Sequence, residues 1–158
     1  DDLNFFKGQL SFYNNDYKNA LKYFNASGSI ARRWRGGGFS DFSNAHYLLK
    51  TLHSLNMPYS ELLNAGIVYN NSKLASGVDA ATMYLELSAL HSFDNKNKSL
   101  DYLEKAVERG FRNKTLLEDE VFDPIRNNDR FKLILSQMNI FIQREKLKFK
   151  EAGLIPNV

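Results

Sequence analysis

Apolar side chains recur at steps of three and four residues along almost the whole of this 158-residue chain. Such spacing gathers them on one side of an α-helix, whereas a half-buried β-strand would alternate apolar and polar residues and favour β-branched ones. Alternation of that second kind is hard to find here. The spacing therefore predicts an all-α fold. The length suits one domain over residues 1–158, able to bury roughly 70% of the surface of its unfolded chain.

Turn and cap residues divide the apolar stripes into pairs of helices. Residues 14–16, Asn-Asn-Asp, interrupt the first stripe and offer an N-cap to a second helix. Pro58 suits the first turn of a fourth helix, and Asp79 can cap a fifth. We therefore expect three antiparallel pairs, at about residues 2–30, 42–72 and 79–109. The stripe that marks the first helix is Leu3, Phe6, Leu10 and Tyr13.

The first pair carries a recognisable pattern of small and aromatic residues. Gly8 is a small residue where two helices would touch, and it is followed by an aromatic residue and a polar turn that ends in Asp16-Tyr17. Ala20 then precedes an aromatic residue, Phe24, by four positions. Gly8 and Ala20 permit close approach of the two helices, and Phe24 would fill the gap before the next pair.

The third pair repeats this pattern over residues 94–106, with Ser99 and Ala106 at the small positions. Repeated helix pairs of similar length are typical of solenoid proteins. In these motifs the chain resembles the tetratricopeptide repeat (TPR) family, which implies a right-handed α-α superhelix. The middle pair matches the family pattern poorly, so the register of that repeat stays open.

The resemblance continues beyond the third pair. Gly110 stands where a helix C-terminus favours a left-handed residue. Residues 111–138 are similar to the segment that closes many bacterial arrays of this family, where the last repeat would otherwise expose its stacking surface. A C-terminal helix is expected at about 129–152. Such end-of-array domains resemble the C-terminal parts of larger bacterial proteins, and the absence of an initiator methionine leads us to expect a processed product or a piece of a longer chain.

In the family's geometry the first helix of each pair lines a concave surface, and spacings of four and seven residues also place side chains on one face. The resemblance thus implies a groove for a protein or peptide partner, with aromatic anchors and His or Lys for hydrogen bonds. The alternative is that the aromatic residues are simply packed and the histidines solvated. The residues expected to line the groove are Phe5, Gln9, Phe12, His46, Lys50, His53, Tyr84, Ser88 and His91.

A second candidate site is the loop Arg32, Arg33, Trp34 and Arg35, which precedes three glycines. Backbone N–H groups of the glycines together with guanidinium groups can bind an anion, and the indole can stack. The segment lacks the Gly-Lys-Ser/Thr ending of a phosphate-binding loop. A hinge with Trp34 in the core explains the same residues.

Enzymatic and metal sites are not indicated. The chain has no cysteine, no His-Glu-x-x-His and no Gly-x-Ser-x-Gly, so we expect no catalytic residue, no cofactor and no metal. His46 and His53 are separated by roughly 10 Å of helical rise, too far for two ligands of one ion. Phe5 and Gln9 stand where the carboxylate clamp of chaperone-binding family members would need Lys and Asn.

The charge balance favours a protein partner over nucleic acid or membrane. The net charge of +3 is too small to act as a footprint for nucleic acid, and no apolar run approaches the length of a membrane span. The basic stretch 143–150 contains Leu147 and Phe149, which suits either an anionic membrane or packing back on the array, and we favour packing.

We therefore expect a protein-interaction or regulatory scaffold. The alternatives are an accessory domain of a multidomain enzyme or signalling regulator and, less favoured, a nucleic-acid-binding helical repeat. The sequence leaves the compartment open, with the cytoplasm slightly favoured.

Overall fold

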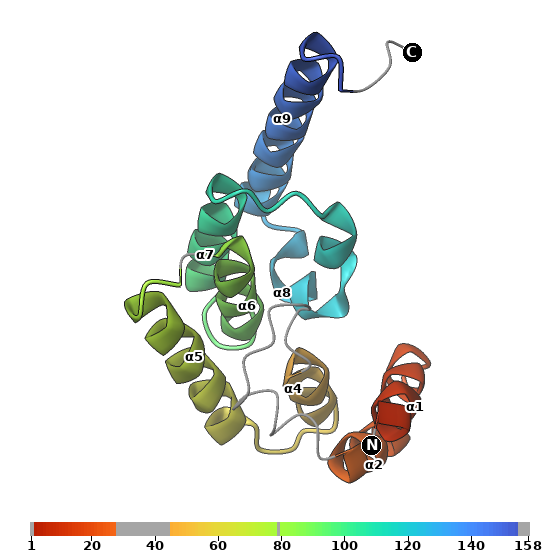
Figure 1. The fold of residues 1–158 in the computed structure, drawn as a ribbon. Helices are drawn as coiled ribbons and strands as arrows, with labels where there is room; N and C mark the ends of the chain where they lie inside the picture. The colour runs from red at the N-terminus through yellow and green to blue at the C-terminus, as the bar shows by residue number, and fades with distance from the viewer. Residues whose placement is uncertain (1, 28–44, 79, 155–158) are drawn as a thin grey trace.

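The computed structural model describes residues 2–78 and 80–154 except for 28–44. Every regular element in these residues is helical, which confirms the all-α class for the described part of the chain (Figure 1). The elements are α1 Asp2–Tyr13, α2 Tyr17–Ser27, α4 Ala45–Ser54, α5 Ser60–Ala75, α6 Ala81–His91, α7 Lys96–Glu108, the short 3₁₀ helices η1 Lys114–Glu118 and η2 Glu120–Phe122, α8 Asp123–Arg126 and α9 Asp129–Glu151.

Helices α1 and α2 form a tight antiparallel pair. The turn between them uses Asn15 at φ 58°, and the Asp16 side chain accepts a hydrogen bond from the backbone N–H of Asn19 at 3.3 Å. Gly8 allows the close approach that the sequence suggested, because a Cβ atom at this position would lie 2.5 Å from the Phe24 ring. The face of α1 against α2 is thus built from Gly8 and its buried neighbours Phe5 and Phe12.

The middle pair differs from the expected arrangement. Helices α4 and α5 do not pack side by side along their length: α4 packs mainly on α2, and α5 packs mainly on α6. The connection between them contains Asn56 in the left-handed region at φ 52° and then Pro58. Leu49 of α4, Leu63 of α5 and Leu90 of α6 share one small buried cluster, so α6 takes part in the contact between the two helices.

Helices α6 and α7 form the second tight pair. Their crossing point contains two buried serines that bond across it: the Ser88 hydroxyl donates to the Ser99 carbonyl at 2.8 Å, and the Ser99 hydroxyl donates to the Ser88 carbonyl at 2.7 Å. Ser99 is therefore a small contact residue, as the repeat pattern suggested. Helix α7 begins at an Asn95 cap and is followed by Gly110 at φ 103°.

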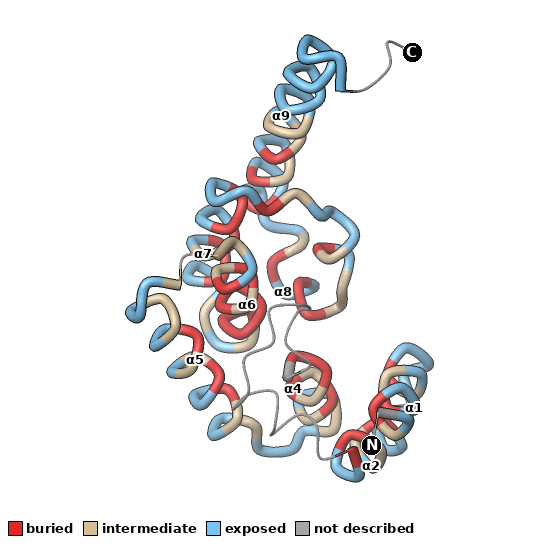
Figure 2. The backbone as a smooth tube through the Cα atoms, in the orientation of Figure 1, coloured by how far each residue is buried: buried red, intermediate tan, exposed pale blue. Residues whose placement is uncertain are grey.

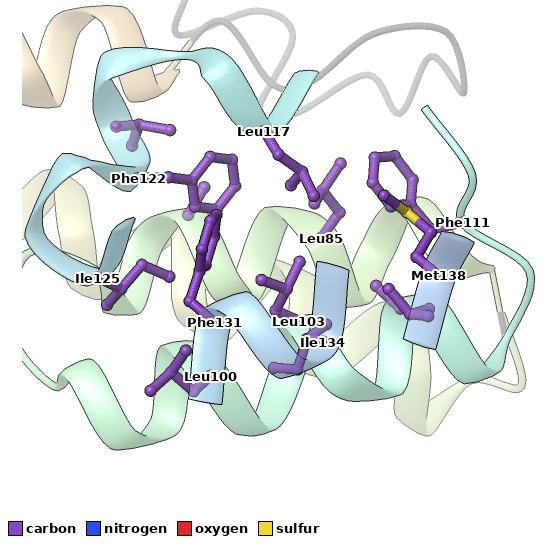
Figure 3. Packing of buried hydrophobic residues seen from close by; sticks show 14 residues of the cluster. Leu85, Leu100, Leu103, Phe111, Leu117, Phe122, Ile125, Phe131, Ile134 and Met138 are labelled. Carbon is purple, nitrogen blue, oxygen red and sulfur yellow. The ribbon is translucent and has the colours of Figure 1, made fainter. Parts of the chain in front are cut away.

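The main core lies where α6 and α7 meet the segment 111–126 and the first half of α9 (Figure 3). Phe111 folds back into this core just after Gly110, and Phe122 and Ile125 fill its far end. From α9 the core receives Phe131, Ile134 and Met138. The segment after α7 thus covers the apolar face of the last helix pair.

Helix α9 continues beyond the body of the molecule (Figure 1). Residues 143–154 are all exposed, so the C-terminal part of α9 does not pack on the other helices (Figure 2). We predicted from the sequence that this basic stretch packs back on the array, and that prediction is wrong. Arg112 marks the last firm contact, because its guanidinium lies 3.0 Å from Glu145 and 4.8 Å from the centroid of the Phe141 ring.

Candidate functional site

Five of the nine residues expected to line the groove are buried, and two of these are the phenylalanines of α1. Phe5 and Phe12 lie in an aromatic cluster with Phe24 and Tyr47. The ring centroids of Phe12 and Tyr47 are 5.2 Å apart, with the rings nearly perpendicular. These side chains join α1, α2 and α4. The other buried members of the predicted groove are His46, Ser88 and His91.

His46 lies at the contact between α4 and the segment that follows α7. Its Nε2 atom is 3.5 Å from Oδ2 of Asp119, and the two side chains are 3% and 14% exposed. Burial by itself would raise the pKa of Asp119, but the neighbouring His46 ring and the hydrogen bond from the backbone N–H of Val121 hold that pKa below its ordinary value. The pair therefore ties α4, in the N-terminal half of the fold, to the segment that follows α7.

His91 also has partners within the fold. Its ring stacks on Tyr102 with centroids 5.4 Å apart, and its Nδ1 atom is 3.0 Å from Oδ1 of Asp94. Asp94 lies in the turn between α6 and α7. His91 and Ser88 thus contribute to the pairing of these two helices.

Four predicted groove residues keep side-chain surface: Gln9, Lys50, His53 and Tyr84. His53 is the most exposed of them, and it forms an aromatic triad with Tyr59 and Phe93. The ring centroids in this triad are 5.6 to 6.0 Å apart. Tyr84 packs against the main core. The structure therefore brings only part of the predicted set to the surface.

The largest unexpected feature is on α1. Leu3, Phe6, Leu10 and Tyr13 are 65%, 63%, 65% and 56% exposed, and we call these four residues the α1 outer face. They mark the helix in the sequence, but α1 packs through the opposite side (Figure 2). The sequence contains a pattern that could have predicted the buried side of α1, because Phe5, Gly8 and Phe12 form a second apolar stripe at helical spacing.

Two side chains of the α1 outer face contact aromatic residues that lie beneath it. The Tyr13 hydroxyl is 2.6 Å from the Tyr47 hydroxyl, and the Phe6 ring centroid is 6.1 Å from that of buried Phe5. Burial and the contact with Tyr13 raise the pKa of the Tyr47 phenol, so the Tyr47 side chain stays neutral at physiological pH. The α1 outer face therefore has no charged side chain among its four residues, and two of these, Phe6 and Tyr13, contact buried residues beneath them.

The other candidate site lies outside the described residues: Arg32, Arg33, Trp34 and Arg35 fall within 28–44. Among the residues that the structure does describe, no cluster of three His, Asp or Glu side chains could hold a metal ion. None of the described helices combines the length and apolar character needed to cross a membrane.

Comparison with known protein families, with curated proteins and with solved structures finds no match for this chain.

Proposed function

We propose that this chain is a protein-interaction module that binds a helix of a partner through the α1 outer face. The right-handed TPR-like superhelix inferred from the sequence belongs to this proposal. The observation that supports it most is the exposure of four large apolar side chains in one continuous stripe on α1. A helix that is apolar on two opposite faces is typical of a position between two layers of protein.

The geometry of the stripe favours a helical partner. Residues 3, 6, 10 and 13 follow one another by three, four and three positions, the spacing with which one helix contacts another. An extended peptide would instead need open backbone edges or a groove with separate pockets. The stripe therefore suits an amphipathic helix laid along α1.

The size of the surface sets the strength of binding. An aromatic side chain buries about 150–250 Å² and a leucine less, so two aromatic and two leucine side chains that are a little more than half exposed offer roughly 450 Å². At about 25 cal/mol per Å² this is on the order of 10 kcal/mol before the costs of association, which are themselves estimated at about 4–15 kcal/mol. The net affinity is therefore weak to moderate, as suits a reversible interaction module.

Site-specific photo-crosslinking tests the proposal in the cells that produce the protein. Leu10 is replaced by the photoreactive residue p-benzoylphenylalanine, and Val68 of α5, which is 68% exposed, is replaced in the same way as a control. We expect a covalent protein adduct from position 10 and none from position 68. Adducts from both positions in equal yield, or from neither, would contradict the proposal.

A further inference from the structure

We propose that the partner helix is α1 of a second copy of this chain, so that two molecules pair through their α1 outer faces about a two-fold axis. This inference rests on the proposed function, because it names the occupant of the same surface. Two properties of the stripe support a second copy, its heptad spacing and its lack of charge, and its size sets the strength of the pairing.

The spacing is that of a self-pairing seam. Leu3 and Leu10 stand at one heptad position, and Phe6 and Tyr13 stand at the other, so the pattern over two heptads is a-d-a-d. Each exposed side chain has a neighbour of similar size one turn away. A side chain of the partner helix can insert between two such neighbours. By contrast, the outer side of α9 exposes one large apolar residue per seven at Leu133, Ile140 and Leu147, and polar residues lie between them.

The charge pattern also favours an identical surface. Between residues 3 and 15 the only charged side chain is Lys7. Its Nζ atom lies 5.8 Å from the centroid of the Tyr23 ring of α2, to one side of the stripe. A polyanion or a strongly charged helix would find no complementary charge here, whereas a second copy brings an equally uncharged face. A two-fold axis makes such a contact closed and isologous.

The area predicts a weak pair. Two stripes of roughly 450 Å² would bury about 900 Å² together, below the 1,200–2,000 Å² of stable complexes and in the range of transient ones. We expect monomers at low concentration and dimers at high concentration, with half-dimerisation between about 10 μM and 1 mM. The preorganised Tyr13 and Phe6 rings reduce the side-chain entropy lost on pairing.

Sedimentation equilibrium of the full chain over that concentration range tests the pairing. The double variant Phe6→Lys, Leu10→Lys should remain monomeric throughout, because pairing would bury lysine side chains. The matched control Val68→Lys, Leu133→Lys changes two equally exposed apolar residues on α5 and α9 and should dimerise like the parent chain. Should the lysine variant misfold by circular dichroism, Leu10→Gln alone takes its place. A parent chain that stays monomeric at about 1 mM, or a control that loses dimerisation equally, overturns the proposal.

Cross-linking distinguishes this inference from the proposed function. The chain has no native cysteine, so Leu10→Cys provides a single thiol for a short bis-maleimide, and Val68→Cys provides the control. We expect a covalent dimer from Leu10→Cys alone. In the photo-crosslinking experiment, an adduct of twice the chain mass supports both proposals. An adduct of any other mass from position 10 is consistent with the proposed interaction module but contradicts the pairing of two copies. The absence of any adduct contradicts both proposals.

Discussion

Replacing Arg126 should loosen the segment that covers the main core. The guanidinium of Arg126 in α8 donates to three successive backbone carbonyls: Leu117 at 2.9 Å, Glu118 at 3.0 Å and Asp119 at 2.9 Å. It also donates twice to one carboxylate oxygen of Asp123, at 3.1 and 3.0 Å. A single planar guanidinium group thus fixes the backbone between η1 and η2.

The expected loss follows from the exposure of these groups. Hydrogen bonds from a charged donor contribute about 1.5–3 kcal/mol when buried, and here the side chain of Arg126 is 34% exposed. We therefore expect Arg126→Met to lower the free energy of unfolding by roughly 2 kcal/mol in total, most of it from the carbonyls. The bond to Asp123 is a solvent-accessible ion pair and contributes about 0–1 kcal/mol.

Urea denaturation followed by far-UV circular dichroism measures this loss. Arg126→Lys should recover less than half of it, because an ammonium group cannot reach three carbonyls in one plane. Asp123→Asn serves as the control and should cost less than about 1 kcal/mol. If Arg126→Lys is as stable as the parent chain, the guanidinium fork is not what holds the segment, and the reasoning fails.

Three further predictions concern the same half of the molecule. Phe122 is fully buried beside the Phe131 ring (Figure 3), so Phe122→Ala should lower the unfolding free energy by about 3–5 kcal/mol in the same denaturation assay. Gly110 has φ 103° and open space around it, so Gly110→Ala should cost about 1–2 kcal/mol from backbone strain alone, measured by thermal unfolding. The pKa of Asp119 is lower in the folded chain than its ordinary value of 3.8. Ionised Asp119 therefore stabilises the fold above pH 3.8, and this stabilisation is lost as the pH falls through the lowered pKa of the folded state. Urea midpoints of Asp119→Asn should therefore fall less on acidification than those of the parent chain, and an equal fall would contradict this.

Local features of the fold could be read from the sequence because they depend on neighbouring residues. The interruption at residues 14–16 and the glycine at 110 both end helices in the structure. Asn95, in the polar turn before the sixth helix, accepts the N–H of Lys98 at 3.1 Å as an N-cap. Helix α9 covers Asp129–Glu151, where the sequence suggested about 129–152.

The candidate site depends on contacts between residues that are far apart in the sequence. The spacing of apolar residues along the chain does not predict such contacts. Helix α1 has two apolar stripes, and the one that contains Gly8 is buried because it packs on Phe24 of α2 and Tyr47 of α4. His46 has the spacing of a surface residue in a repeat, but it is buried against Asp119, far away in the sequence. The direction of the chain after Asn56, which separates α4 from α5, likewise follows from tertiary packing.

The uneven division of the core connects stability with binding at α1. The main core joins α6, α7, the closing segment and α9, whereas α1 and α2 depend on the smaller aromatic cluster around Phe12 and Tyr47. Polar links such as Tyr17 to Glu120, at 3.4 Å, add little to that attachment. The α1–α2 pair should therefore open more readily than α6–α7, and a helix that covers the α1 outer face should stabilise this pair most.

Amide hydrogen exchange at low and high protein concentration measures the opening of these helix pairs. Protection should rise in α1 and α2 with concentration while α6 and α7 stay unchanged, and a uniform rise across all four helices would contradict the coupling.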